Sequence, residues 1–174
     1  MLTRLLVLGG ARSGKSRYAE QRCVEAGGER VYLATAQPFD EEMRDRIARH
    51  RADRGGGWQT IETPIALAEA IEAEGLPGRV LLVDCLTLWT SNLLLAEIDV
   101  QRETLRLTRA IDRCKADLVL VSNEVGLGIV PDNALARRFR DEAGRINQAV
   151  AAACDDVVFV AAGLPMTLKS RAKP

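Results

Sequence analysis

The chain has 174 residues, which is enough for one domain with a hydrophobic core and too few for two comfortable domains. Its 24 basic and 24 acidic residues cancel, which argues against a general electrostatic hold on nucleic acid. No apolar run reaches the roughly 18 residues of a membrane span. The N-terminus lacks a secretory pattern, because the apolar run at 5–8 leads directly into glycines. We therefore predict a single domain over residues 1–174.

Short apolar runs alternate with helix-like segments along the chain. Strands are expected at 2–8, 30–34, 58–61, 79–84, 117–122 and 157–161, and helices at 16–26, 39–53, 64–74, 86–96, 100–115 and 134–153. Gly126, Gly128 and Pro131 predict a loop over 123–133, and the tail at 170–174 is expected to be frayed. This alternation predicts an α/β fold of three layers, with a mostly parallel central sheet flanked by helices.

Gly9–Ser16 (GGARSGKS) fits the phosphate-binding P-loop pattern GxxxxGK[ST], after a predicted strand and before a predicted helix. In such a loop the backbone curls so that successive N–H groups point at phosphate oxygens, and the positive end of the helix adds to the attraction. The residues expected to contact phosphate in this way are Gly9, Gly10, Ala11, Arg12, Ser13 and Gly14. Lys15 is expected to reach the β and γ phosphates, and the Ser16 hydroxyl to bind Mg²⁺. The alternative is a glycine-rich turn without a ligand.

Asp84 ends the apolar run RVLLVD at 79–84. In P-loop proteins an acid at this place holds Mg²⁺, directly or through water. The alternative is an aspartate that caps the next helix, and the two roles are compatible. These features fit a kinase, an NTPase or a nucleotidyltransferase without choosing among them, and the NKxD guanine signature of GTPase switches is absent from the sequence.

The only histidine, His50, falls in an arginine-rich predicted helix. A neutral imidazole can attack an α-phosphate and form a phosphoramidate, and nearby arginines would stabilise the phosphoryl charge. On composition alone, a half-exposed histidine on a helix face is the simpler interpretation. A zinc site is not expected with one histidine. The four cysteines (Cys23, Cys85, Cys114 and Cys154) match neither a CxxC site nor a disulfide framework, so reduced thiols in a cytoplasmic protein are predicted.

Four stretches occur in an order that carries more information than any single residue. They are GGARSGKSRYAE at 9–20, ATAQPFDEEMRDRIARHR at 34–51, LVDCLTLWTSNLL at 82–94 and VSNEVGLGIVPDNALARRFRDEAGRINQ at 121–148. Together they resemble the bifunctional adenosylcobinamide kinase/adenosylcobinamide-phosphate guanylyltransferase family of cobalamin biosynthesis. The resemblance covers nearly the whole chain, and the last stretch is far more specific than the P-loop.

The resemblance implies two reactions on one substrate. Adenosylcobinamide is phosphorylated with ATP or GTP, and GMP is then transferred from GTP to the new phosphate through a GMP–histidine intermediate, with release of pyrophosphate. The family's histidine lies in a DxEMxxRIxxH stretch, which here runs from Asp40 to His50. Many relatives carry a second histidine just before it, where this chain has Arg49. The resemblance also implies a homo-oligomer, a trimer in which neighbouring chains share a site.

Further nucleotide contacts follow from the same resemblance. They fall on Thr35, Ala36 and Gln37 after the second strand, on Arg51, Ala52, Asp53 and Arg54 after the histidine, and on Glu62 and Asp84. For Glu62 the alternative is a solvated loop acid. Asn123 and Glu124 are candidates for substrate or metal contact, since they leave a central strand at the end that faces the ligand crevice, and the alternative is a turn built by glycines.

Two rival functions remain at this point. One is a plain small-molecule kinase that uses the P-loop, with His50 incidental. The other is a nucleotide-dependent switch or binding module without chemistry of its own.

Overall fold

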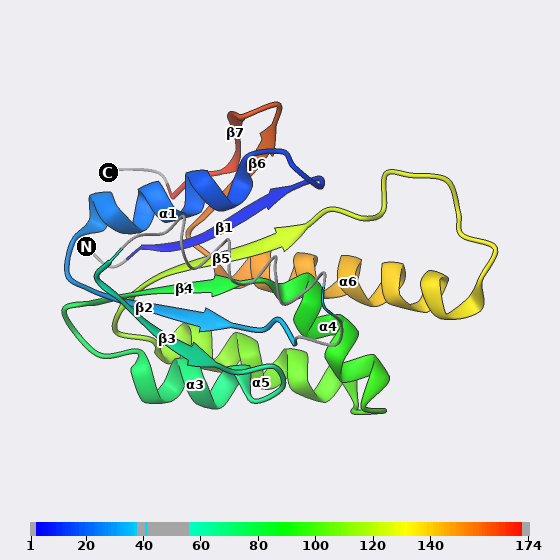
Figure 1. The fold of residues 1–174 in the computed structure, drawn as a ribbon, viewed down its shortest axis with the longest axis horizontal. Coiled ribbons are helices and arrows are strands. Elements are labelled where there is room, and N and C mark those ends of the chain that lie inside the picture. Colours follow the sequence, from blue (N-terminus) through cyan, green and yellow to red (C-terminus); the bar gives the residue numbers. More distant parts are fainter. Residues whose placement is uncertain (1–2, 38–40, 42–55, 172–174) are drawn as a thin grey trace.

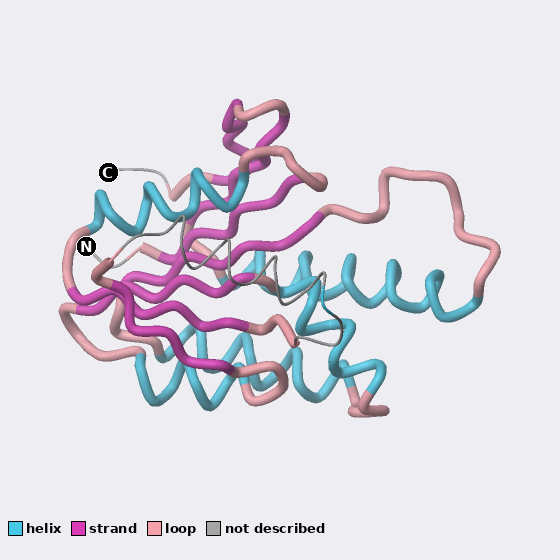
Figure 2. Tube along the Cα trace, viewed as in Figure 1, coloured by secondary structure: helices cyan, strands magenta, loops and turns pink. Residues whose placement is uncertain are grey.

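The computed structural model describes residues 3–37, 41 and 56–171. Seven strands form one sheet in the order β3-β2-β4-β5-β1-β6-β7 (Figures 1 and 2). The strands are β1 (Arg4–Gly9), β2 (Glu29–Ala34), β3 (Trp58–Glu62), β4 (Arg79–Asp84), β5 (Asp117–Asn123), β6 (Asp156–Ala161) and β7 (Leu164–Lys169). All neighbouring strands pair in parallel except β6 and β7. The predicted α/β fold with a mostly parallel sheet is confirmed.

Helices cover both faces of the sheet, unequally. The described helices are α1 (Lys15–Ala26), α3 (Leu67–Glu74), α4 (Leu86–Leu95), α5 (Val100–Arg113) and α6 (Ala134–Ala153). Figure 1 shows α1 on one face and α3, α5 and α6 on the other. One apolar cluster lies under α1 and includes Val7, Leu82 and Val121, whereas the larger cluster on the other face includes Leu81 and Leu120. Neighbouring residues of one strand thus feed two cores, which explains why the central strands are apolar throughout.

The strand β7 is a departure from the sequence prediction, which ended its last strand at 161. All six residues from Leu164 to Lys169 are exposed, and Pro165 lies within them. A proline inside a short run argues against a strand, but an edge strand tolerates it because one side makes no ladder hydrogen bonds. β7 is such an edge strand: it lies at the end of the described sheet and pairs with β6 in an antiparallel hairpin.

The helix predicted at 64–74 begins later than expected, at Leu67. The carbonyls of Pro64 and Ile65 accept hydrogen bonds from the side chains of Asn92 (2.9 Å) and Trp89 (2.8 Å) of α4. These tertiary bonds hold the segment before the helix in a non-helical conformation, and no sequence-local pattern reveals them. The other described helices and the loop between β5 and α6 agree with the prediction to within one or two residues, which is the usual uncertainty of helix ends. The predicted helix at 39–53 lies outside the described residues, apart from Glu41.

The parallel arrangement collects several chain segments at one edge of the sheet. Gly9 is the register partner of Asn123, Asp84 that of Val121, and Ala34 that of both Asp84 and Glu62. The carboxyl ends of β1, β5, β4, β2 and β3 therefore meet at this edge, which is where open α/β sheets bind their ligands.

Candidate nucleotide-binding site

The P-loop joins the end of β1 to the start of α1. The chain turns at Arg12 and Gly14, whose φ angles of 55° and 94° lie in the left-handed region. Lys15 opens the helix with 8% of its surface exposed, and its Nζ donates a hydrogen bond to the Gly10 carbonyl at 3.0 Å. The ammonium group thus lies against the P-loop, where it is expected to bind the phosphates.

Two close approaches hold the loop in this shape. A Cβ on Gly9 would come within 2.6 Å of the Val160 carbonyl oxygen, and one on Gly14 within 3.2 Å of the Gly163 Cα. The Gly163 N–H donates to the Ser13 carbonyl at 2.8 Å. The turn between β6 and β7 therefore supports the P-loop from behind, which gives the unpredicted strand β7 a role in positioning the site.

The start of α1 is chemically open to an anion. Asp99 and Asn133 cap α5 and α6 with their side chains, but Gly14 provides no side-chain cap for α1. Ser13 Oγ is buried and has no hydrogen-bond partner among the described residues. Uncapped helix N–H groups and a buried hydroxyl are the donors that phosphate oxygens satisfy, so this loop fits a phosphate group.

Asp84 projects toward the same face as the P-loop helix. It follows Leu82 by two positions in β4, and Leu82 packs in the cluster under α1. The Tyr32 hydroxyl donates to Asp84 Oδ2 at 3.0 Å and orients the carboxylate. Ser16 is half-buried in the first turn of α1, and α1 packs over β4 and β5.

Ser16 and Asp84 offer Mg²⁺ one hydroxyl and one carboxylate. Mg²⁺ prefers oxygen ligands, and in phosphate sites it takes few from the protein and the rest from phosphate and water. The donor set therefore fits this ion. Within the described parts of the chain, no group of three or more His, Cys, Asp and Glu side chains is arranged to hold a metal.

Thr35 is fully buried just after β2. Its Oγ1 accepts from the Cys85 N–H and donates to the Cys85 carbonyl, both at 2.7 Å, and its own carbonyl accepts from Asn92 Nδ2 at 2.8 Å. In this conformation Thr35 fixes the start of the segment that continues through half-buried Ala36 and Gln37. A nucleotide contact through this segment stays a prediction, with Ala36 and Gln37 as its accessible members.

Sequence reasoning did not identify Tyr32 and Asn92 as residues that organise the site. Both carry a detectable signal, because each is a polar group in an apolar setting. Tyr32 is buried in β2, and Asn92 is 5% exposed within the apolar helix LTLWTSNLLL. A buried hydroxyl or amide requires partners, and here those partners are Asp84 and the carbonyls of Thr35 and Pro64.

Glu62 is exposed at the end of β3, the edge strand. Four strand spacings separate β3 from β1, which corresponds to about 19 Å between Glu62 and the start of the P-loop. At this separation the Glu62 carboxylate lies too far from the P-loop to contact phosphates held there, and a nucleotide contact through Glu62 stays a prediction. His50, Arg51, Ala52, Asp53 and Arg54 lie outside the described residues.

The four cysteines are buried and unpaired, as predicted for reduced thiols. Burial raises the pKa of Cys23 and of Cys154 to about 12 and that of Cys85 to about 11, and it also raises the pKa of Cys114. Thiols with such pKa values are protonated near neutral pH and are poor nucleophiles.

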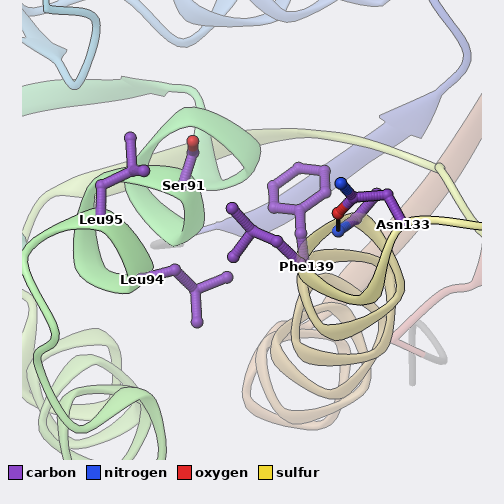
Figure 3. Close-up of a pocket in the computed structure, with 7 residues that line it drawn as sticks. Ser91, Leu94, Leu95, Asn133 and Phe139 are labelled. Carbon is purple, nitrogen blue, oxygen red and sulfur yellow. Dashed lines mark hydrogen bonds between the residues drawn. The ribbon is translucent and has the colours of Figure 1, made fainter.

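A second concave feature lies away from the P-loop, between α4 and the start of α6. Figure 3 shows this apolar pocket, to which Leu94 and Leu95 contribute from α4 and Phe139 from α6. Its volume is about 260 Å³, and none of its lining residues belongs to the P-loop. Leu127, Ile129 and Val130, in the preceding loop, are 83%, 96% and 61% exposed. We call these three residues the apolar ridge.

The described helices include none that is both long enough and apolar enough to cross a membrane.

The chain is similar in sequence to a family of known proteins over most of its length. The family model described as cobinamide kinase / cobinamide phosphate guanyltransferase matches residues 5–168. The bifunctional adenosylcobalamin biosynthesis protein CobP of Pseudomonas aeruginosa is 52% identical, with 94% of this chain and 96% of that protein covered. The protein CobU of Escherichia coli, with the same description, is 42% identical, with 95% and 99% covered.

Two solved structures with low sequence identity are similar to this chain in fold. An ATPase from the type III secretion system of pathogenic bacteria superposes with a TM-score of 0.55 at 15% identity, covering 97% of this chain and 57% of that one. A Pyrococcus horikoshii protein superposes with a TM-score of 0.58 at 9% identity, covering 98% and 88%. The similarity to an ATPase agrees with the predicted P-loop fold.

Proposed function

The chain belongs to the cobinamide kinase / cobinamide phosphate guanyltransferase family, and from this premise we propose that it phosphorylates adenosylcobinamide and then transfers GMP to the product. The family match supplies the two reactions, and the structural observation that supports them is the complete P-loop. Its helix start is open, Lys15 lies over it, and Asp84 projects toward the same face. The product is adenosylcobinamide-GDP, and the second reaction releases pyrophosphate.

In the kinase step the alcohol oxygen of adenosylcobinamide forms a bond to the γ-phosphorus of ATP or GTP. The bond from that phosphorus to the β,γ-bridging oxygen breaks, the nucleoside diphosphate leaves, and the hydroxyl proton passes to solvent. Lys15 and the loop N–H groups hold the β and γ phosphates and stabilise the charge that develops on them. Ser16 and Asp84 would hold Mg²⁺, which when bound withdraws negative charge from the phosphate oxygens.

In the transferase step a neutral imidazole nitrogen of His50 attacks the α-phosphorus of GTP. A phosphorus–nitrogen bond forms, the α,β bridging bond breaks and pyrophosphate leaves. An oxygen of the cobinamide phosphate then attacks the same phosphorus, and the phosphorus–nitrogen bond breaks to free the histidine. The nucleotide would also be contacted by Ala36, Gln37, Arg51, Ala52, Asp53, Arg54 and Glu62. The place of Glu62 on the edge strand supports a contact distant from the phosphates.

Labelling with GTP that carries radioactive α-phosphate tests the histidine step. We expect acid-labile, base-stable label on the wild-type protein and none on His50→Ala. A kinase with an incidental histidine predicts no label on either protein while phosphorylation of cobinamide continues. A binding module predicts no turnover, which mass spectrometry of cobinamide incubated with GTP detects directly.

We also propose that the chain forms a homotrimer in the cytoplasm. The apolar ridge protrudes, and the pocket lined by Leu94, Leu95 and Phe139 is hollow and apolar, so the two surfaces are complementary rather than alike. Contacts between unlike surfaces join copies head to tail, and the series of copies closes into a ring when the rotation between neighbours is suitable. Apolar side chains exposed to this degree favour burial against a partner. Light scattering measures the assembly size, and a monomer at micromolar concentration would contradict the proposal.

A further inference from the structure

Asn123 is the described residue whose position and hydrogen bonds the two reactions above leave unexplained. It ends β5, the strand between β1, which carries the P-loop, and β4, which carries Asp84. Its register partner is Gly9, the first residue of the P-loop, and the next N–H, of Glu124, donates to the Gly9 carbonyl at 3.1 Å. A phosphate held by the P-loop and approached by Asp84 therefore lies over the end of β5.

Alternation along β5 places Asn123 on the side of the nucleotide. Val121 packs in the apolar cluster under α1, and Asn123 follows it by two positions. Ser122, between them, points to the opposite face, where its Oγ donates to Asn147 Oδ1 of α6 at 2.7 Å. By this alternation the Asn123 side chain leaves the strand on the same face as Asp84, and its amide reaches Thr87 at the start of α4.

A closed chain of hydrogen bonds fixes the amide of Asn123. The Ser122 hydroxyl has one proton and donates it to Asn147. The bond between Ser122 Oγ and Thr87 Oγ1, 3.3 Å apart, must therefore be donated by Thr87. Thr87 Oγ1 can then only accept, and it accepts from Asn123 N at 2.7 Å and Nδ2 at 3.3 Å. Asn147 Nδ2 closes the chain at the Asn123 carbonyl, 3.4 Å away.

The direction of this chain decides which groups of Asn123 are available. The amide nitrogen must face Thr87, because Thr87 has no proton left to give to the amide oxygen. One of the two Nδ2 protons binds Thr87, and the second makes no hydrogen bond to any described residue. The side chain therefore keeps one donor available at the end of β5, and the bond to Thr87 restrains its orientation.

We propose that Asn123 donates this hydrogen bond to the γ-phosphoryl group of the bound triphosphate, as a further catalytic residue of phosphoryl transfer held in place by Thr87, Ser122 and Asn147. The inference rests on the proposed kinase reaction. A neutral amide suits this place, since it donates to the phosphoryl oxygens and adds no negative charge beside them. The transferase step breaks a bond at the α-phosphate, two phosphates away from the γ-phosphoryl group that Asn123 would contact. Loss of the contact should therefore slow the kinase reaction more than the transferase reaction.

Steady-state kinetics of Asn123→Ala test the proposal. We expect kcat for cobinamide phosphorylation to fall about 100-fold, the size found for one donor to a developing oxyanion. The kcat of guanylyl transfer to cobinamide phosphate, supplied directly with saturating GTP, is expected to stay within about threefold of wild type. Asn123→Asp, which removes the donor and adds a like charge, is expected to lose at least as much kinase activity. Kinase activity within threefold of wild type in Asn123→Ala, or equal losses in both reactions, would overturn the proposal.

A binding measurement separates this inference from the proposed function. Calorimetry with a non-hydrolysable ATP analogue and with ADP gives the contribution of the γ-phosphate without any cobinamide. In Asn123→Ala we expect the analogue to bind about tenfold more weakly and ADP to bind as in wild type. Thr104→Ala is the control, because it removes a side-chain hydrogen bond within α5, away from the P-loop and from Asn123, and should leave the ratio of the two affinities unchanged. An unchanged ratio in Asn123→Ala contradicts the contact even if wild-type protein does not turn over cobinamide.

Discussion

The P-loop and the loop between β5 and α6 leave the sheet side by side, yet they are built in opposite ways. The P-loop folds back onto its own chain, where the turn at Gly163 supports it and Lys15 lies buried over it. The second loop extends outward (Figure 1), with its apolar ridge exposed. Hydrogen bonds to the described residues anchor it near its ends, from Glu124 N–H to the Gly9 carbonyl and from Arg137 to the carbonyls of Pro131 and Asp132.

This difference indicates which part of the site one chain completes by itself. Backbone groups and a buried lysine form the phosphate loop without outside help. The second loop exposes apolar surface that a second copy of the chain would bury. Asn123, the last residue of β5 before this loop, is the register partner of Gly9 in the P-loop. Changes in the P-loop should therefore act within each chain, and changes in the apolar ridge should act through assembly.

Replacing Lys15 with Ala should produce the largest effect. Loss of the ammonium removes a charged donor to the β and γ phosphates, and we expect kcat/KM of both reactions to fall by about 100- to 1000-fold. Steady-state assays with each substrate measure this, and Lys115→Ala is the control because Lys115 is an exposed lysine elsewhere on the chain. Retention of either reaction at the wild-type rate would show that Lys15 does not serve both.

Gly14→Val tests whether the P-loop shape depends on close packing within the chain. The φ angle of 94° and the approach to Gly163 disfavour any Cβ, so we expect the free energy of unfolding to fall by roughly 2–3 kcal/mol. Gly10→Ala is the matched control, since a Cβ there meets nothing within 4 Å. Urea unfolding compares the two variants, and equal stabilities would mean that the loop adjusts its backbone.

Ile129→Ser tests the apolar ridge. Exposing one fewer apolar side chain should leave the stability of the separate chain unchanged, while the loss of about 2 kcal/mol of burial per contact should weaken self-association. Sedimentation over a concentration series measures the assembly equilibrium. Leu76→Ser, at another exposed leucine outside this loop, should leave it unchanged. An unaltered equilibrium in Ile129→Ser would exclude the ridge from the interface.

The buried thiols should give the smallest effect, on alkaline stability. The pKa of Cys23 is raised to about 12 in the folded chain, so its contribution is fully present below pH 9 and is lost as the pH rises toward 12. We expect the free energy of unfolding of wild type to fall by about 1.4 kcal/mol more than that of Cys23→Ala between pH 8 and pH 10. Parallel losses in the two proteins would mean that Cys23 ionises without a penalty.

The sequence by itself determined the features that depend on neighbours along the chain. The P-loop pattern from Gly9 to Ser16 and the apolar strands are local, because glycine conformations and side-chain alternation act over a few residues. The family resemblance added its assigned residues, of which the structure describes Asp84, Glu62 and the segment from Thr35 to Gln37 at the same edge of the sheet.

Only the tertiary structure decided which distant groups meet. The late start of α3, the edge strand β7 behind the P-loop, the Tyr32 bond to Asp84 and the ordered amide of Asn123 all depend on partners far away in the sequence. Such contacts arise from strand order and from the need of buried polar groups for partners, and neither is written in a local pattern. The sequence identified a phosphate-binding loop, and the packing of the chain placed Asp84 and Asn123 beside it.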